Sequence, residues 1–297
     1  MILINDPKDA PQGPKVIAVG SFDGVHLGHQ ALLARALALA RQRRLPLLVY
    51  TFDPPTKVFT QGARVLSTLS EKAERLAKAG AEIVLAVPFD AAFARRSKEA
   101  FLEELKALEP RAFVVGEDFR FGRGREGGPE DLKALAPTVA VPLLHVDGEP
   151  VKSSRIRAAL QEGDVASAAK LLGSPYTVRG VVVPGDQRGQ KLGFPTANVA
   201  VPRLKVLPPG VFAVWAGHRG ERFAGVANVG TRPTFGARGE PRLEVHLLEP
   251  NADLYGEELE VAFVQRLRPE RAFENPEALK AQIARDVAAA KKALGLG

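Results

Sequence analysis

Two histidines near the start of the chain have the spacing of a phosphate site. His26 and His29 lie three residues apart, after an apolar run and at the start of a helical pattern. Side chains at this spacing point to the same side of a helix start, where backbone amides and the positive end of the helix dipole attract anions. Gly28 leaves room between the two imidazoles. Donors fixed in this way stabilise the charge that develops when an α-phosphate is attacked, so the sequence predicts a nucleotide site here.

A second polar segment, residues 152–157, suits a polyphosphate leaving group. Its six residues include three cations and two hydroxyls: Lys152, Ser153, Ser154, Arg155 and Arg157. Charged donors bind phosphate oxygens strongly. The same residues also suit a solvated helix start, and this pattern alone leaves both interpretations open.

Residues 185–198 have the composition of another phosphate site. The segment combines glycines and two cations with the hydroxyl of Thr196 and the amide of Asn198. In an extended segment these two residues face the same way, and their oxygens are ligands of the type that Mg²⁺ shares with phosphate. The Gly-Lys-Ser/Thr order of a Walker loop is missing. A glycine-rich hairpin without a ligand is the alternative.

A carboxylate at position 244 could act as a base. Residues 243–247 alternate apolar and polar side chains, so Glu244 and His246 share the face opposite the aliphatic residues. Phosphoryl transfer needs a group that accepts the proton of the attacking hydroxyl. A solvent-facing strand residue is the alternative for Glu244.

The sequence pattern around His26 and His29 predicts that a parallel sheet positions this histidine pair. Short apolar runs alternate with helical patterns, which is typical of an open sheet with helices on both faces. The runs cover residues 16–20, 47–52, 83–87, 112–116 and 139–146, and the helical patterns cover about residues 29–43, 70–79, 98–108 and 129–136. Ser70 is the expected N-cap of the second helix. Ligands of such sheets bind outside the carboxyl ends of the strands.

From about residue 174, closely spaced short strands replace this alternation. Their turns are rich in glycine and proline, which is typical of a small antiparallel barrel. The expected strands cover residues 178–183, 211–215, 223–229, 243–248 and 259–267. A terminal helix follows, with Asn275 as its N-cap and Pro276 as its first residue. The predicted domains are residues 1–174 and 175–297.

The composition is that of a globular protein. The chain has 297 residues, enough for about two domains, and it contains no cysteine, which excludes disulfides, thiol catalysis and zinc–thiolate sites. No apolar run approaches the ~18 residues of a membrane span. Residues 1–6 lack the pattern of an export signal. We therefore expect a cytoplasmic protein with no membrane partner.

Several motifs resemble the bacterial bifunctional riboflavin kinase/FAD synthetase family. Residues 20–29 read Gly-Ser-Phe-Asp-Gly-Val-His-Leu-Gly-His and resemble its nucleotidylyltransferase signature. Residues 193–198 read Gly-Phe-Pro-Thr-Ala-Asn and resemble the hallmark of its kinase module. Further similar stretches are residues 115–122, 153–157, 171–176, 227–235, 244–248 and 267–273. The resemblance extends from about residue 16 to residue 290.

This resemblance implies two ATP-dependent sites in one chain. The fold would be a nucleotidylyltransferase-like, Rossmann-like α/β domain followed by a β-barrel domain with a terminal helix. The barrel would phosphorylate riboflavin to FMN with Mg-ATP, and the first domain would transfer AMP from ATP to FMN, giving FAD and pyrophosphate. The implied catalytic residues are His26 and His29 in the first domain and Glu244, the base for the ribityl hydroxyl, in the second.

The implied ligand contacts occur in both domains. In the first domain, ATP would contact Gly20, Ser21, Phe22, Asp23, His26, Gly28, His29, Ser153, Ser154 and Arg157. In the second domain, ATP would contact Gly185, Lys191, Gly193, Pro195, Thr196 and Asn198. Thr196 and Asn198 would also bind Mg²⁺. The flavin would contact Asp118 and Phe119 in the first domain and Arg268 and Phe273 in the second.

The chain departs from the family pattern at two places. Many members carry Pro-His-Pro after the second strand, where this chain has Pro54, Pro55 and Thr56. The role of that histidine in adenylyl transfer must therefore be taken by other residues, or the transfer must be less efficient. Lys152 and Ser154 replace the usual Ser and Thr of the later motif. This change keeps a hydroxyl and adds a cation, so it is tolerable.

Two other functions compete with this hypothesis. A His-x-Gly-His domain joined to a small barrel could be a tRNA synthetase fragment that binds RNA. The net charge of +7 is spread along the chain, however, and no basic stripe is interleaved with aromatic residues, so we expect no nucleic-acid partner. A single-activity adenylyltransferase whose barrel only stores or senses flavin is the other rival. Intact Thr196, Asn198 and Glu244 argue against it. The oligomeric state stays unknown.

Overall fold

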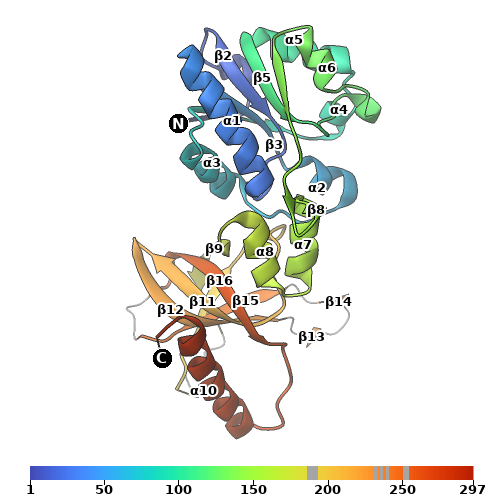
Figure 1. Ribbon diagram of the computed structural model, residues 1–297. Helices are drawn as coiled ribbons and strands as arrows, with labels where there is room; N and C mark the ends of the chain where they lie inside the picture. The colour runs from blue at the N-terminus through green and yellow to red at the C-terminus, as the bar shows by residue number, and fades with distance from the viewer. Residues whose placement is uncertain (186–192, 231–232, 235–236, 239–240, 250–253, 297) are drawn as a thin grey trace. The chain divides into compact units, whose positions relative to one another are not determined.

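The computed structural model describes residues 1–185, 193–230, 233–234, 237–238, 241–249 and 254–296 (Figure 1). The chain divides into two compact units, Met1–Ser153 and Ser154–Gly297. This division falls before the boundary between residues 174 and 175 that the change in sequence pattern predicts, and that boundary stays a prediction.

A six-stranded parallel sheet forms the centre of the first unit. Its spatial order is β1-β4-β3-β2-β5-β6, and every neighbouring pair is parallel. The strands are β1 Ile2–Ile4, β2 Lys15–Val19, β3 Leu47–Asp53, β4 Ile83–Pro88, β5 Pro110–Gly116 and β6 Thr138–Val141. The expected Rossmann-like sheet is therefore confirmed, and the carboxyl ends of adjacent β2 and β3 meet at one edge.

Helices cover both faces of this sheet, which explains why its strands are apolar throughout. Figure 1 shows α1 Leu27–Arg43 and α3 Leu69–Lys78 on one face, with α5 Lys98–Ala107 and α6 Pro129–Lys133 on the other. Each face has its own apolar core. Leu33 and Leu76 belong to the first core, and Phe101 and Leu132 belong to the second.

The N-cap of the second expected helix lies two residues before its expected position. Thr68, and not Ser70, is the N-cap of α3. The Thr68 hydroxyl accepts a bond from the Glu71 amide at 3.3 Å, and the Glu71 carboxylate accepts one from the Thr68 amide at 2.7 Å. This reciprocal capping box satisfies two amides at once, whereas Ser70 already lies inside the first turn. The Ser70 prediction is wrong for that reason.

The expected strand over residues 139–146 is two strands. β6 ends at Val141, and the next residue, Pro142, has no N–H to donate to a ladder. β7 His145–Val146 pairs instead with β8 Glu149–Pro150 in a separate hairpin. The sequence pattern also missed β1, together with the short helices η1 Pro7–Asp9, α2 Thr56–Gln61, α4 Ala91–Ala94 and η2 Arg123–Arg125.

The second unit contains a closed antiparallel barrel, as expected. Its order is β10-β15-β12-β11-β16-β9. The strands are β9 Tyr176–Val183, β10 Ala197–Ala200, β11 Gly210–His218, β12 Glu221–Gly230, β15 Arg242–Leu247 and β16 Glu258–Arg268. Only β10 is missing from the expected set, and β13 Pro233–Thr234 pairs with β14 Ala237–Arg238 outside the barrel. On β11 the ring of Trp215 lies 4.1 Å from the guanidinium carbon of Arg222.

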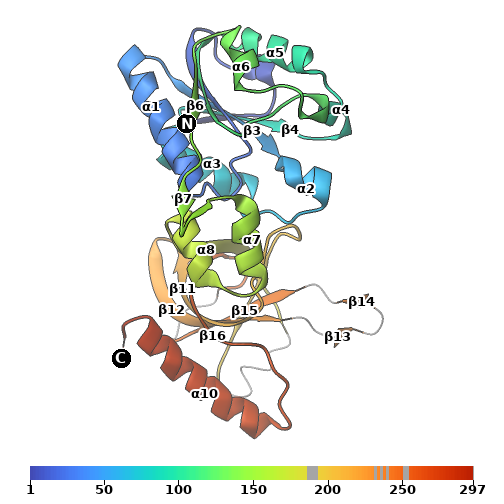
Figure 2. The same ribbon diagram turned by 45° about the vertical axis from the view of Figure 1, so that its right-hand side comes forward.

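Helices accompany the barrel in the described part of this unit. α7 Ser153–Gln161 and α8 Val165–Leu172 precede it, and α10 Pro276–Ala293 packs against β11, β12 and β16 (Figure 2). The Asn275 side chain caps α10 by accepting a bond from the Ala278 amide at 2.8 Å, and Pro276 is its first residue, which confirms both expectations. Within the described part of the chain, every helix is too short or too polar to cross a membrane.

Candidate active sites

The two histidines stack at the amino terminus of α1. His26 is the N-cap of this helix, and its Nδ1 accepts a bond from the His29 amide at 3.4 Å. The two rings lie 3.6 Å apart and only 14° from parallel. A Cβ on Gly28 would lie 3.4 Å from the His26 ring, so a glycine there keeps the approach to the imidazole open. The structure therefore brings the pair together as the spacing predicts.

The turn that leads into this helix has an unusual backbone. Phe22, Gly24 and Val25 have φ angles of 48°, 82° and 43°, and a β-branched residue such as Val25 rarely adopts a positive φ. The Phe22 side chain is fully buried and packs edge-on against His29 at 5.2 Å. Any nucleotide contact of Phe22 is therefore made by its backbone. A Cβ on Gly20 would lie 3.0 Å from the Phe22 ring.

Side chains from other elements hold the carbonyl groups of this turn. Thr51 Oγ1 donates to the Ser21 carbonyl at 3.0 Å, and Ser153 Oγ donates to the Asp23 carbonyl at the same distance. Gln30 Nε2 donates to the Val25 carbonyl at 2.9 Å. Because these carbonyls are satisfied by the protein, the turn is fixed before a ligand arrives.

Asp23 also holds this backbone with its side chain. Its carboxylate is buried, with 2% exposure, and accepts bonds from the amides of Leu66 at 2.9 Å and Ser67 at 3.1 Å. Asp23 and Ser153 are both predicted to contact ATP, yet the polar atoms described for them bind the turn and its neighbour. Direct contact with the nucleotide stays a prediction for both residues.

Burial is the main influence on the charge of His29. The pKa of His29 lies well below its ordinary value of 6.5, first because burial disfavours the imidazolium and then because His26 and Lys72 repel a second charge. His29 Nδ1 is buried and has no hydrogen-bond partner among the residues that the structure describes. His29 is thus a neutral imidazole near neutral pH.

The predicted flavin contacts of this unit follow β5. Phe119 packs against Phe121 with ring centres 5.6 Å apart. The carboxylate of Asp118 lies 3.8 Å from the ammonium of Lys152, with both side chains about half exposed. An exposed pair of this kind adds little stability, so both groups can turn toward a ligand. Ser154 and Arg157, from the same polar segment as Lys152, belong to the second unit.

An aromatic cluster that the sequence did not predict lies at the carboxyl ends of β3 and β4. Phe52 lies 5.4 Å from both Phe89 and Phe93, and Phe59 of α2 lies 5.8 Å from Phe89. Phe59 keeps 45% of its surface exposed beside these rings. Thr56, at one of the two departures from the family pattern, begins α2. Phenylalanines directly after strands were the signal that could have revealed the cluster.

The barrel unit holds its own pocket of about 250 Å³. It brings together four predicted site residues: Thr196, Glu244, Arg268 and Phe273. Glu244 lies on the face of β15 opposite the buried Leu243 and Val245, as its alternation predicts. His246 on the same face lies with Nδ1 2.8 Å from the Pro195 carbonyl.

A polar row crosses three strands beside this pocket. Glu244 of β15 is paired with Asn198 of β10 on one side and with Asn228 of β12 on the other. Directly paired residues have neighbouring side chains. A Cβ on Gly185 would lie 2.0 Å from the Asn198 side chain, so only glycine fits there. Asn228 was missed because the register of β12 is not visible in one sequence. Lys191 lies outside the described residues, and Gly193 is exposed.

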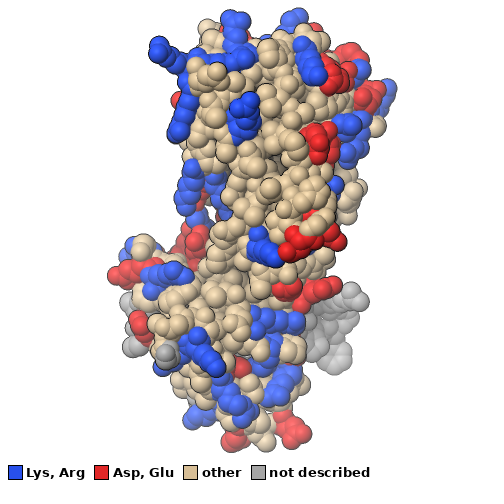
Figure 3. Space-filling view, in the orientation of Figure 1, with Lys and Arg blue, Asp and Glu red and all other residues tan. Residues whose placement is uncertain are grey.

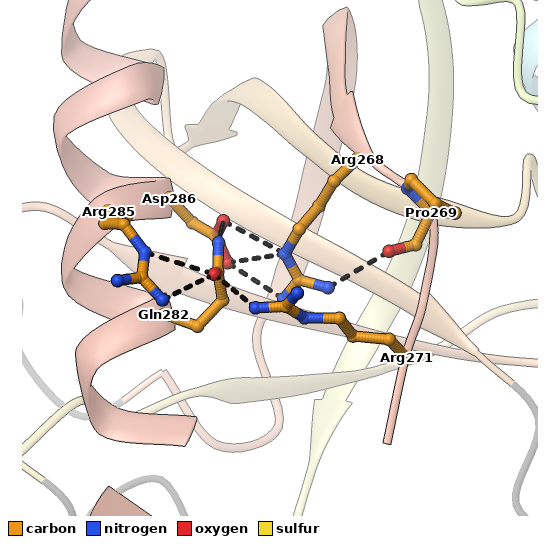
Figure 4. Close-up of polar contacts among 6 residues, drawn as sticks. All are labelled: Arg268, Pro269, Arg271, Gln282, Arg285 and Asp286. Carbon is orange, nitrogen blue, oxygen red and sulfur yellow. Dashed lines mark hydrogen bonds and ion pairs between the residues drawn. The ribbon is translucent and has the colours of Figure 1, made fainter. Parts of the chain in front are cut away.

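An ion pair closes the pocket toward α10. Arg268, at the end of β16, binds the carboxylate of Asp286 through Nε at 3.0 Å and through Nη2 at 2.9 Å (Figure 4). Asp286 is buried, with 4% exposure. A bidentate pair fixes the guanidinium plane as well as its position. Arg268 is therefore held rigidly at the pocket wall.

Gln282 extends this network to the segment after β16. Its amide donates to Asp286 at 2.7 Å and its oxygen accepts from Arg271 at 2.5 Å (Figure 4). The ring of Phe273 lies 5.6 Å from the guanidinium carbon of Arg268 and 4.9 Å from that of Arg271. The predicted flavin contacts Arg268 and Phe273 are thus held together by α10.

The donor set of the barrel fits a magnesium ion shared with phosphate. Thr196 and Asn198 offer neutral oxygens, and Glu244 adds a carboxylate in the same row. In the described ranges, no group of three or more histidine, aspartate, glutamate or cysteine side chains could hold a metal by itself. A metal here would depend on the oxygens of ATP.

Comparison with known proteins matches both units separately. A family model described as FAD synthetase matches residues 8–156, and one described as riboflavin kinase matches residues 172–294. The chain is 40% identical over 304 residues to a bifunctional riboflavin kinase/FMN adenylyltransferase of Escherichia coli, covering 99% of this chain and 97% of the relative. The chain belongs to the bifunctional riboflavin kinase/FMN adenylyltransferase family.

Two further proteins extend the likeness. A relative from Bacillus subtilis with the same description is 37% identical, covering 93% of this chain and 91% of its own length. A crystal structure described as a macrolide-efflux protein from Streptococcus pneumoniae is 31% identical, covers 98% of both chains and has a TM-score of 0.88. The family likeness therefore includes both units and the elements that carry the two sites.

Proposed function

We propose that this chain phosphorylates riboflavin to FMN in the barrel and adenylylates FMN to FAD at the histidine pair. The observation that carries the proposal is the separation of the two phosphate-type sites into two units, each matched by its own family model. ATP is the co-substrate of both reactions. The chain acts in the cytoplasm.

In the kinase reaction, Glu244 accepts the proton of the ribityl hydroxyl. Gly185, Lys191, Gly193 and Pro195 contact ATP, and Thr196 and Asn198 provide oxygens for Mg²⁺ and ATP. When bound, Mg²⁺ neutralises the charge of the transferring phosphate. Arg268 and Phe273 hold the flavin at the pocket wall. The polar row supports this assignment because it places Glu244 at the pocket, directly paired with Asn198 and Asn228 on the neighbouring strands.

In the second reaction, the phosphate of FMN attacks the α-phosphate of ATP and pyrophosphate leaves. FMN phosphate is already ionised near neutral pH, so no strong base is needed. His26, His29 and the turn at residues 20–25 position the nucleotide and stabilise the developing charge. Asp118 and Phe119 contact the flavin, and the exposed ring of Phe59 offers an apolar surface for its isoalloxazine.

A product assay tests both activities together. The full-length protein is incubated with riboflavin and Mg-ATP, and the flavins are separated by chromatography. We expect FMN and FAD, and we expect neither when EDTA removes the metal. If FMN forms without FAD, the chain lacks adenylylation activity, and the replacement of the family's Pro-His-Pro at Pro55 and Thr56 would explain that loss. If neither FMN nor FAD forms in the presence of Mg-ATP, the proposal is overturned.

The competing RNA-binding function has little support. Lysine and arginine side chains are interspersed with acidic ones over the face seen in Figure 3. Nucleic-acid sites gather basic residues into a stripe or patch. Retention of labelled tRNA by the protein at physiological salt, in the absence of flavin products, would favour this alternative.

A further inference from the structure

A buried cation near the histidine pair has no part in the reactions as derived above. Lys72 of α3 has 1% exposure, although lysine is almost never fully buried unless it is paired. Its ammonium donates to the Phe52 carbonyl near the carboxyl end of β3 at 2.6 Å. Because it is buried, it cannot touch ATP directly, so any effect on the reaction must pass through its neighbours.

The elements around Lys72 also hold the turn at residues 20–25, which leads into α1 and is proposed to position the nucleotide. The residues just before α3, Leu66 and Ser67, bind the Asp23 carboxylate, and the Ser67 hydroxyl accepts a bond from the Gly24 amide at 3.0 Å. One helical turn after Lys72, Arg75 donates to the Gly24 carbonyl at 3.0 Å. The segment from Leu66 to Arg75 is thus fastened to the turn at both of its ends, with Lys72 between them.

We propose that Lys72 is a positioning residue for adenylyl transfer. Its ammonium ties α3 to the end of β3 and, through its charge, keeps His29 an uncharged hydrogen-bond donor toward the nucleotide. This inference rests on the proposed role of the histidine pair. An uncharged donor adds no full charge that would hold ATP and pyrophosphate in the ground state, and only binding that is stronger in the transition state raises the rate of the chemical step.

The electrostatics of the cluster agree with this role. Lys72 lowers the pKa of His29, in addition to burial and the neighbouring His26. Burial lowers the pKa of Lys72 itself to about 8, and the carboxylates of Asp53 and Asp23 oppose that decrease. Lys72 therefore keeps its charge through the acid and neutral range, and this charge adds to the two larger effects, burial and His26, that oppose protonation of His29.

The test compares K72M with K78M in the full-length protein. Lys78 is an exposed lysine on the same helix and serves as the matched control. FAD formation from FMN is followed as kcat against pH. Far-UV circular dichroism of the same preparations reports that the parallel-sheet unit is folded, and riboflavin kinase activity reports the same for the barrel unit. We expect K72M to lose activity at low pH, with the acid limb of kcat shifted to higher pH, while KM for ATP changes less than kcat. K78M and the kinase activity should be unchanged.

A second measurement separates positioning from a structural role. The His29 imidazole is followed by NMR as pH is varied, and its titration midpoint should rise in K72M by the same amount as the acid limb. K72Q keeps a donor for the Phe52 carbonyl without the charge and should behave like K72M. If K72M does not fold, K72Q serves as the test variant.

Two outcomes would overturn the inference. One is a loss of FAD formation that is equal at all pH values, and the other is an unchanged profile in K72M and K72Q. H29A distinguishes these from a failure of the proposed function. If H29A keeps full adenylylation, the histidine site itself is wrongly assigned, whereas an inactive H29A with a normal K72M removes only the role of Lys72.

Discussion

At the scale of single residues, Glu244 depends on its neighbours for a defined position. It is half-buried at the pocket, between Asn198 and Asn228, with the barrel core behind its strand. The proposed base would act from this position at the pocket, where a correctly placed group accelerates proton transfer. Its role is therefore testable by a change that keeps its shape.

E244Q should abolish most FMN formation and leave FAD formation from added FMN intact. A glutamine fills the same space but accepts a proton poorly, and loss of a general base typically lowers the rate ~10²–10⁴-fold. The measurement is kcat for each reaction on one preparation. E221Q, at an exposed end of β12, is the control. Equal loss of both activities in a folded E244Q protein would contradict the two-site assignment.

H29A should have the opposite effect. Removing one preorganised donor typically costs ~10²–10³ in rate, so FAD formation should fall while riboflavin phosphorylation continues. H145A is the matched control, because His145 is exposed on β7. Accumulation of FMN from riboflavin in H29A, followed by chromatography, checks the prediction. FAD formation at the wild-type rate would remove His29 from the site.

Sequence patterns located most of the residues with polar chemistry but not all of their neighbours. His26, His29 and Glu244 were visible because their spacing within one element defines a shared face. Asn228 and Asp286 were not, because they meet Glu244 and Arg268 only through strand register and helix packing. Lys72 was missed for the same reason, since nothing in its local sequence indicates burial.

At the scale of elements, α10 does more than close the barrel. Its carboxylate at position 286 holds Arg268 at the pocket wall, and Gln282 links that pair to Arg271. Two arginines of the pocket wall, Arg268 and Arg271, are therefore held by one face of α10. The terminal helix, predicted from its Asn275 cap, its start at Pro276 and the helical spacing of its apolar residues, thus contributes to the wall of this pocket.

D286N should weaken riboflavin binding. An amide cannot hold the guanidinium with the same bidentate bonds, and a hydrogen bond to a charged group is worth about 1.5 kcal/mol, so we expect KM for riboflavin to rise about tenfold with a smaller change in kcat. Steady-state kinetics of the kinase reaction provide the test. E277Q, exposed on the same helix, should behave like wild type. An unchanged KM would mean that Arg268 needs no partner.

The elements that the sequence missed are short or lie at an edge. β1 has three residues, at the edge of the sheet, and β10 has four. Neither is long enough to show a period, and each is defined by a neighbour far away in sequence. The longer strands β3, β11 and β16 were found because burial of several successive positions leaves a pattern in the chain itself.

At the scale of the whole molecule, the lowered pKa of His29 links stability to pH. The pKa of His29 lies below 6.5 in the folded chain, while the unfolded chain binds a proton near 6.5. As the pH falls below 6.5, the unfolded state takes up a proton that the folded state does not, so stability decreases. The contribution is complete above pH 6.5 and is lost on acidification toward the folded pKa.

Thermal melting between pH 8 and pH 5 should show this loss. H29N removes the titrating group, so its melting temperature should fall less steeply below pH 6.5 than that of the wild type. The comparison uses the difference between the two curves, because other groups titrate in both proteins. Parallel curves over this range would contradict the link between His29 and acid stability.

Trp215 has a practical consequence for the study of this chain. It is the single tryptophan of the sequence and lies on β11, in the barrel. Selectively excited indole fluorescence therefore reports on that unit alone. Oxidised flavins absorb where indole emits, so riboflavin entering the pocket should quench this emission by energy transfer. Occupancy of the kinase site can then be read by titration without any label, and loss of the signal on heating follows the melting of the barrel separately from the parallel sheet.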